Sequence, residues 1–220
     1  MGAIQNCREK IVNRFPHAHF SCEISFVLGR FCGIFPMQRI FRKEACMTEG
    51  KFANPVLQTI YERRSIRRFL DAPVDHSQII EALKAASWAP SGLNNQPWRF
   101  ALVRDQETKD KLAGLTRYSA TLKSAGVLIA VFLDREASYD YTKDCQAIGA
   151  CIQNLLLALH SFDLGAVWIG EILKNKDRVL QILQLSDRLE LMAVVAAGHP
   201  VARNQSSHRR PIEELIVLDR

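Results

Sequence analysis

The sequence predicts a layered α+β domain in which helices flank a mixed central sheet. Two runs, 125–133 (AGVLIAVFL) and 191–198 (LMAVVAAG), are apolar almost throughout, which is typical of strands buried on both faces. Between them, residues 144–162 form a long apolar stretch with helical character. The chain has 220 residues, 48% of them apolar, and no internal repeat, so we expect one globular domain, or one domain with a tail.

Two helices are predicted before the first strand. Asn54-Pro55 supplies a good N-cap and a first-turn proline, and apolar residues follow at helical spacing up to an arginine-rich segment. Asp75 or Ser77 can cap the second helix, whose apolar residues form one inner face. The second helix should end before Ala89-Pro90, because a residue that precedes proline is disfavoured in a helix.

The middle of the chain alternates strands with helices. Residues 99–104 (RFALVR) predict a strand, 107–115 a short helix, and 125–133 the central strand of the sheet. The helix predicted over 144–162 is apolar nearly all round. We therefore expect it inside a large core or at an obligate subunit interface.

Four further elements are predicted after this helix. They are a strand over 164–169, a helix over 176–185, a buried strand over 191–198, and a short strand or tail over 212–218. This order of elements predicts helices packed on a sheet.

The positive charge of the chain is unevenly distributed. The formal net charge is +6, of which residues 1–46 carry +4 (seven Lys or Arg, three Asp or Glu) and residues 47–220 carry +2 (22 basic, 20 acidic). A nucleic-acid-binding protein usually has a continuous basic stripe with aromatic residues among it, and this sequence has none. The arginine clusters after residue 47 are therefore local features.

Cysteine usage and hydropathy indicate a cytoplasmic protein without a metal site. Four of the six cysteines lie within residues 1–46, and Cys145 and Cys151 lie in the long apolar stretch without zinc or iron–sulfur spacing. We expect these two to pack as small apolar residues in a reducing compartment. We expect no membrane span and no signal peptide, because neither pattern is found in the sequence.

Residues 1–46 show neither helical nor strand periodicity. Met47-Thr48-Glu49-Gly50 follows and resembles an ordinary protein start. We expect residues 1–46 to be a poorly structured N-terminal extension, or sequence upstream of a natural start at Met47. Residues 47–220 are expected to form the folded domain.

The segment Arg63-Arg64-Ser65-Ile66-Arg67 concentrates cationic side chains at the end of the first predicted helix. Guanidinium groups hold phosphate oxygens in a bidentate fork, and a serine hydroxyl or backbone N–H can complete an anion site. The alternative is structural, because cations also stabilise a helix C-terminus and can form a solvated face. The segment alone leaves both interpretations open.

The loop 89–100 (APSGLNNQPWRF) is dense in amides and in residues that break secondary structure. Asn and Gln can donate to and accept from a heteroaromatic ring, and Gly allows close backbone approach. The alternative is an ordinary turn followed by a core tryptophan. An ordinary turn, however, does not require two Asn and a Gln between two prolines.

Two weaker clusters follow later in the chain. Residues 165–171 (GAVWIGE) leave a strand and enter a loop, where backbone N–H groups can face a ligand; the alternative is a plain strand end. The segment His208-Arg209-Arg210-Pro211 could supply a further arginine to the same anion, or form a basic tail.

In combination, RRSIRRF, APSGLNNQPWRF, LGAVWIGE and the later GHP and RRP segments resemble the FMN-dependent nitroreductase family over about residues 54–218. PSxxNxQPW is the specific part of the pattern, and the short distance between the third and fourth clusters resembles the compact, short-chain branch. The resemblance implies an α+β sandwich and an intertwined homodimer, with one FMN in each of two clefts at the subunit interface. The long apolar helix fits such a dimer core.

The resemblance also implies which residues bind FMN, in three groups. The phosphate and ribityl end would be held by Arg63, Arg64, Ser65, Arg67 and Arg209; the flavin would be lined from the partner subunit by Pro90, Ser91, Gly92 and Asn94; and Trp168, Ile169, Gly170 and Glu171 would run along the isoalloxazine, with backbone N–H near N5. Gln96 and Trp98 are expected to be structural, and Arg68 an ordinary exposed residue.

The implied activity is that of an FMN-dependent NAD(P)H oxidoreductase. Two electrons would pass through flavin N5, with ping-pong kinetics, to a nitroaromatic, quinone or related small aromatic acceptor. The sequence has no GxGxxG fingerprint, so NADH or NADPH is expected as a transient donor without a Rossmann domain of its own. No side chain, His included, is assigned a catalytic role.

Two alternatives remain open at this point. The first is a flavin-binding carrier or sensor without significant NAD(P)H turnover. The second is a phosphate- or nucleotide-binding module without flavin, against which the PSxxNxQPW loop argues. Loops over the flavin are expected at 115–124 or 134–143, where Tyr118, Tyr139 and Tyr141 are predicted to be surface residues.

Overall fold

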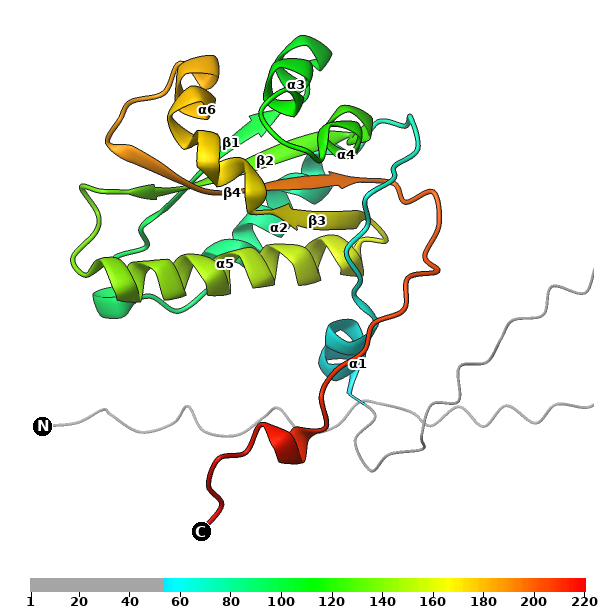
Figure 1. Ribbon diagram of the computed structural model, residues 1–220, viewed down its shortest axis with the longest axis vertical. Helices are drawn as coiled ribbons and strands as arrows, with labels where there is room; N and C mark the ends of the chain where they lie inside the picture. Colours follow the sequence, from blue (N-terminus) through cyan, green and yellow to red (C-terminus); the bar gives the residue numbers. More distant parts are fainter. Residues whose placement is uncertain (1–53) are drawn as a thin grey trace, which may run out of the picture. The chain divides into compact units, whose positions relative to one another are not determined.

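Within residues 54–220, four strands form one antiparallel sheet in the order β1-β2-β4-β3, and helices cover both of its faces (Figure 1). The structure is a computed structural model and describes residues 54–220. The strands are β1 (Trp98–Val103), β2 (Val127–Asp134), β3 (Gly165–Ile169) and β4 (Leu189–Gly198). All eight residues of β2 are buried, which confirms that the apolar run around it is the central strand.

Of the helices that the structure describes, two pack on one face of the sheet and three on the other. The first face carries α2 and α5, and the second carries α3, α4 and α6, so the domain has three layers. The helices are α1 (Pro55–Glu62), α2 (His76–Ser87), α3 (Gln106–Ala113), α4 (Ser119–Ser124), α5 (Tyr141–Ser161) and α6 (Lys176–Leu183). The predicted α+β class with a sheet between helices is confirmed.

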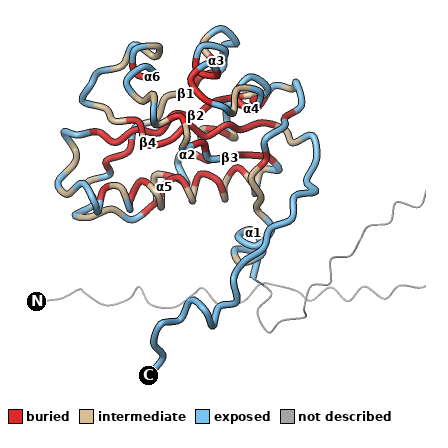
Figure 2. Tube along the Cα trace, in the orientation of Figure 1, coloured by how far each residue is buried: buried red, intermediate tan, exposed pale blue. Residues whose placement is uncertain are grey.

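The alternation of side chains along β2 divides the core into two halves. Val127, Ile129 and Val131 face the α2 and α5 layer, and the intervening Leu128 and Ala130 face α3, α4 and α6. Figure 2 shows the resulting burial, with the sheet and the inner sides of the helices buried. Cys151 on α5 is one of the fully buried core residues, and burial raises the pKa of its thiol to about 12.

The predicted helix starts are confirmed in their capping contacts. The Asn54 side chain accepts a hydrogen bond from the backbone N–H of Val56 at 2.8 Å, and Asp75 accepts one from Ser77 at 2.8 Å. Helix α5 begins three residues earlier than predicted, because Asp140 caps it by accepting from the backbone N–H of Lys143 at 3.0 Å.

Three sequence-based expectations need correction or refinement. The prediction of a strand over 212–218 is wrong, because a 3₁₀ turn, Ile212–Glu214, occupies part of this segment. All of 201–220 is exposed, which agrees with the alternative prediction of a tail. All three strand pairs are antiparallel, and within residues 54–220 the parallel pairing expected of a mixed sheet is an isolated bridge between Ser65 and Ala166. Helix α4 was not predicted.

Helix α5 buries one side against the sheet and leaves the other side half-buried or exposed in the single chain. A Cβ at Gly149, on this open side, would meet no described atom within 4 Å. The predicted boundary at Met47 lies outside the residues that the structure describes. Across residues 54–220, no helix combines the length and the apolar content that a membrane crossing needs.

Candidate functional site

The arginine-rich segment lies along the edge of the sheet, beside β3. The backbone N–H of Ile66 donates to the carbonyl of Ala166 at 3.0 Å, and Ser65 forms the parallel bridge with Ala166. Ile66 is buried against Gly165, where a Cβ would come within 2.8 Å of the Ile66 side chain. This contact brings the first and third sequence clusters together, although about a hundred residues separate them.

The chain that follows β4 returns along the same segment. Val201 N–H donates to the Arg68 carbonyl at 3.1 Å, and Leu70 N–H donates to the His199 carbonyl at 2.8 Å. Phe69 also pairs with Pro200 in an isolated antiparallel bridge. Residues 204–209, which come next in the chain, are thereby carried to the arginines.

A cavity of about 450 Å³ lies where these two segments meet. It is lined by Arg63, Arg64, Ser65 and Arg67 from the first segment and by Asn204, Gln205, Ser206, Ser207 and Arg209 from the second. Sequence reasoning named all four members of the first group and Arg209. It missed 204–207 (NQSS), for which a run of small polar residues just before the basic cluster was the available signal.

Within the described part of the chain, the cations in this cavity lack carboxylate partners. Among the ion pairs of residues 54–220, none includes Arg63, Arg64, Arg67 or Arg209. Burial first, and then the positive charges of Arg209 and Arg64, lower the pKa of the Arg63 guanidinium. The Nε atoms of Arg63 and Arg64 are buried without a hydrogen-bond partner in the described part of the chain. A bound anion would relieve both the repulsion and the unmet donors.

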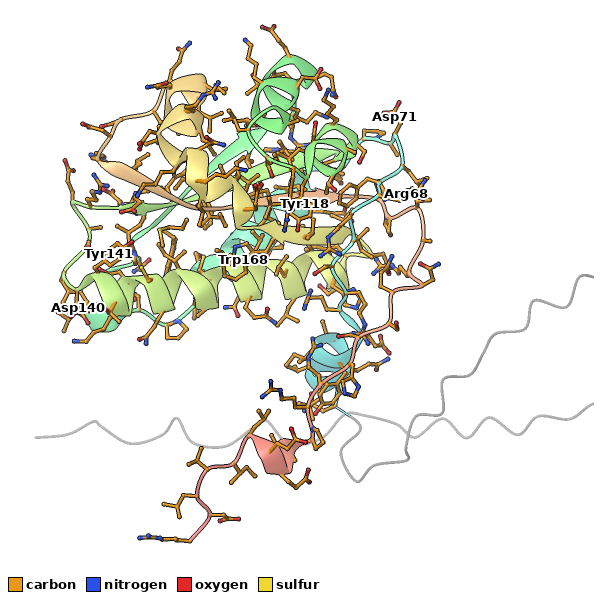
Figure 3. The ribbon with its side chains drawn as sticks, viewed as in Figure 1. Arg68, Asp71, Tyr118, Asp140, Tyr141 and Trp168 are labelled. Carbon is orange, nitrogen blue, oxygen red and sulfur yellow. The ribbon has the colours of Figure 1, made fainter. Side chains whose placement is uncertain are left out.

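Part of the cluster also has the structural role considered from the sequence. The Arg64 guanidinium donates to the carbonyl of Tyr61 at 2.5 Å and to that of Arg63 at 2.9 Å. It therefore satisfies a carbonyl in the last turn of α1, as a cation at a helix C-terminus does. Arg68 is exposed and does not line the cavity; Figure 3 shows it at the outer edge of the segment.

The loop after α2 has an unusual backbone and does not line the arginine cavity. Leu93, Asn94 and Gln96 have φ of 53°, 55° and 46°, the left-handed region that residues with a Cβ seldom adopt. The Ser91 hydroxyl accepts from the Gln96 backbone N–H at 3.1 Å, which closes the loop. Its other predicted site residues are Pro90, which is exposed, and Gly92, which is half-buried. Trp98, predicted to be structural, fills the core at the start of β1.

The strand end at 165–171 presents an aromatic side chain and a tethered acid. Trp168 is 42% exposed, whereas Ile169 is buried in the core on the opposite face of β3. Gly170 is exposed next to the Trp168 indole nitrogen, which a Cβ at Gly170 would meet at 4.0 Å. Figure 3 shows Trp168 between β3 and α5, on the accessible side of the strand.

Glu171 is held by other residues of its own chain. It pairs with Lys174, and its carboxylate accepts from the Thr116 hydroxyl at 2.5 Å and from the Arg117 backbone N–H at 3.2 Å. The hydrogen bond from Lys174, followed by that from Thr116, lowers the pKa of Glu171 from 4.5 to about 2. Its carboxylate thus ties the strand end to the loop at 115–118, a structural link that sequence reasoning did not identify.

The fold and the site define a class: an α+β protein with an arginine-lined cavity at the edge of its sheet. The family model for the nitroreductase family matches residues 60–117 and 115–199. The chain therefore belongs to the nitroreductase family.

Individual relatives agree with this assignment. A solved structure from Desulfovibrio desulfuricans, assigned as a nitroreductase and in complex with FMN, is 50% identical with a TM-score of 0.74, over 77% of this chain and 99% of that one. A protein of Archaeoglobus fulgidus, assigned as an NADH dehydrogenase/NAD(P)H nitroreductase, is 34% identical over 66% of this chain and 84% of its own length. The FMN reductase [NAD(P)H] of Bacillus subtilis is 25% identical over 73% and 72%.

Proposed function

We propose that the chain is an FMN-dependent NAD(P)H oxidoreductase. The observation that carries this proposal is the arginine cavity, whose guanidinium groups have no carboxylate partner among residues 54–220. The relatives support it, because their names include FMN as a ligand and NAD(P)H as a donor.

The residues of the cavity fit the phosphate end of FMN. Arg63, Arg67 and Arg209 supply planar donor forks for phosphate oxygens, and the Ser65 hydroxyl adds a neutral donor. The buried and unpartnered Nε of Arg63 is a donor that an anion would satisfy. Arg64 contributes charge from its place at the end of α1, to which its own hydrogen bonds hold it.

The remaining predicted FMN contacts divide between two places in the chain. Trp168 and Ile169 end β3 beside the Ser65 bridge and Gly170 follows them, so the Trp168 side chain and the backbone of Ile169 and Gly170 can run along the flavin ring. Pro90, Ser91, Gly92 and Asn94 lie in a loop that contributes nothing to the arginine cavity. We therefore propose a homodimer, in which the loop of one subunit lines the flavin held by the other.

Bound FMN supplies two-electron hydride chemistry between NAD(P)H and an acceptor. The residues of the chain bind and orient the reactants: the exposed Trp168 indole offers an apolar wall, and the cationic cavity favours a negatively charged cofactor. The acceptor is proposed to be a nitroaromatic, quinone or related small planar molecule. Donor and acceptor would use the same site in turn, which predicts ping-pong kinetics.

The test is the visible spectrum of the purified protein, the identity of the cofactor released by heat, and anaerobic titration with NADH and NADPH. The proposal predicts released FMN, bleaching of the bound flavin, and recovery of colour on addition of a quinone. Bound FMN that neither donor bleaches would favour the carrier or sensor alternative. A colourless protein that does not bind added FMN would contradict the proposal.

A further inference from the structure

The most completely hydrogen-bonded carboxylate in the described part of the chain belongs to Asp144, in the first turn of α5. It is 0% exposed and forms no ion pair with a described residue. It accepts from Ser138 Oγ at 2.6 Å, Asn95 Nδ2 at 2.7 Å, Tyr139 N at 3.1 Å and Asp140 N at 3.3 Å. Four donors from two separate loops thus converge on one buried group.

The carboxylate is charged despite its burial. Burial acts to raise the pKa of Asp144, but the hydrogen bonds from Ser138, Asn95 and the two backbone N–H groups outweigh it and lower the pKa below its ordinary value. The first turn of a helix also favours a negative charge. A buried charge held in this way fixes the positions of its donors, because each donor would lose a charge-assisted hydrogen bond by moving.

Asn95 carries this constraint into the loop after α2. Its Nδ2 group donates to Asp144 and, at 2.9 Å, to the carbonyl of Ala137, so both amide hydrogens are used. Asn95 stands between Asn94 and Gln96, which have left-handed φ of 55° and 46°. Such conformations cost about 1 kcal/mol or more each and persist only where surrounding contacts hold them. The contact between Asn95 and Asp144 provides that hold.

Tyr139 lies in the loop before α5, and its backbone N–H donates to the same Asp144 carboxylate. Its hydroxyl stands where a side chain at Gly92 would be, 1.9 Å from an ideal Cβ, so this glycine is required for the contact. The Lys143 ammonium lies 5.2 Å from the centre of the Tyr139 ring. Tyr139 was expected to be a surface residue; it is 45% exposed, yet its hydroxyl end covers the predicted flavin loop.

We propose that Asp144 and Asn95 are positioning residues that set the shape of the flavin loop 90–97, and that Tyr139, held by the same carboxylate, forms part of the wall of the cofactor or acceptor pocket beside Gly92. This inference rests on the proposed function, in which that loop contacts FMN. Figure 3 shows Asp140 and Tyr141, at the start of α5, on the opposite side of the domain from Arg68. Asp144, Asn95 and Tyr139 therefore lie away from the arginine cavity of their own chain, at the loop proposed to line the flavin held by the other subunit.

The test compares Asp144→Asn with a matched variant of a buried polar residue that touches neither loop. Lys109→Met is suitable, because Lys109 is buried in α3 and donates to the Ala125 carbonyl at 2.9 Å. For each full-length protein, FMN affinity is measured by fluorescence titration. The visible circular dichroism of the bound flavin is then recorded at saturating FMN, together with the midpoint of thermal unfolding.

Asp144→Asn is expected to weaken FMN binding about tenfold, the loss of one or two charge-assisted hydrogen bonds, and to change the flavin spectrum even at saturation. Lys109→Met is expected to lower the unfolding midpoint while leaving FMN affinity and spectrum unchanged. If Asp144→Asn does not fold, the same measurements are made on Asn95→Ser, for which the same changes in FMN affinity and flavin spectrum are expected.

An Asp144→Asn protein, or failing that an Asn95→Ser protein, with wild-type FMN affinity and flavin spectrum would overturn the inference. A wild-type protein that does not bind FMN would overturn the proposed function and this inference with it. Tyr139→Phe tests the pocket wall: a changed KM for a quinone at unchanged FMN affinity supports it, and an unchanged KM contradicts it.

Discussion

Two groups of charged residues in this protein differ in whether their charges are paired with residues of the chain. At the end of β2, Asp134 is 2% exposed and pairs with Arg99 at 2.8 Å and Arg188 at 3.3 Å, and Arg188 also pairs with Glu136 at 2.7 Å. At the edge of β3, the cavity arginines have no described carboxylate partner.

The difference separates structural charges from charges available to a ligand. Charges that meet their partners within the chain satisfy one another, and removing one partner of such a pair destabilises the fold. Arg63 and Arg64 are half-buried, and neighbouring cations of this kind cost stability unless an anion joins them, which is typical of a binding site. The predictions below test this contrast in order of decreasing effect.

The largest effect is expected for the double variant Arg63→Ala/Arg67→Ala. Loss of two charge-assisted contacts should cost about 3–6 kcal/mol of FMN binding, which is a hundredfold or greater rise in Kd. Stability of the protein without FMN should not fall, because the repulsion at Arg63 is removed. Fluorescence titration of FMN measures the effect.

Arg68→Ala is the matched control for that variant. Arg68 belongs to the same segment but is exposed and does not line the cavity. Its removal should leave the FMN Kd within about twofold of wild type. Equal losses for Arg68→Ala and the double variant would indicate general electrostatic attraction in place of a specific clamp.

The second largest effect is expected at Asp134, which pairs with two arginines at the end of β2. Asp134→Asn should lower the free energy of unfolding by about 2 kcal/mol, because Arg99 and Arg188 lose a charged acceptor. The FMN Kd should stay unchanged. Urea denaturation and FMN titration measure the two quantities. A large loss of FMN affinity without a loss of stability would reverse the roles assigned to the two groups.

The sequence predicted the layers better than the site. Long apolar runs identified β2 and β4, because a strand buried on both faces leaves an unmistakable pattern. Helix α4 (SATLKS) was missed because it is short, mostly polar and has no side-chain cap. The strand considered at 212–218 is not formed, because its apolar residues pair with no strand of residues 54–220 and remain exposed.

The site required information that local patterns do not contain. Arginine-rich and Gly165-containing segments were recognised separately, but the Ser65–Ala166 bridge that joins them is a long-range contact. The polar residues 204–207 reach the cavity only because the chain turns back at His199 and Val201. The hydrogen bond that joins Asp144 to the loop after α2 could not be predicted either, since its donor Asn95 is 49 residues away in the sequence.

The third prediction concerns Gly165, where strand β3 packs against the arginine-rich segment. Gly165→Ala should cost about 1–3 kcal/mol of stability, because the new Cβ would press on Ile66, which lies between the cavity residues Ser65 and Arg67. FMN affinity should fall as well. Gly114→Ala is the control: it has helical φ of −66° and ordinary contact distances, so neither quantity should drop. Gly165→Ala with unchanged FMN affinity would show that the clamp is independent of the strand.

The smallest effect is expected at Glu171. Its pKa is lowered from 4.5 to about 2, so its favourable contacts are fully present above pH 4.5 and are lost as the pH falls toward 2. Glu171→Gln should therefore lower the stability modestly at pH 7 and flatten the decline seen for the wild type in this range; the effect is small because solvent partly screens a side chain that is 22% exposed. Unfolding midpoints at pH 7, 4 and 3 measure this; identical pH profiles for the two proteins would contradict it.

The most direct test of the central claim, that the arginine cavity holds the phosphate of FMN, compares FMN with riboflavin, which lacks only that phosphate. Affinities of both ligands are measured for the wild type, for Arg63→Ala/Arg67→Ala and for Arg68→Ala. We expect the wild type and Arg68→Ala to prefer FMN by about a hundredfold or more, and the double variant to bind both ligands with similar, weak affinity. Equal binding of FMN and riboflavin by the wild type, or an undiminished preference for FMN in the double variant, would contradict it.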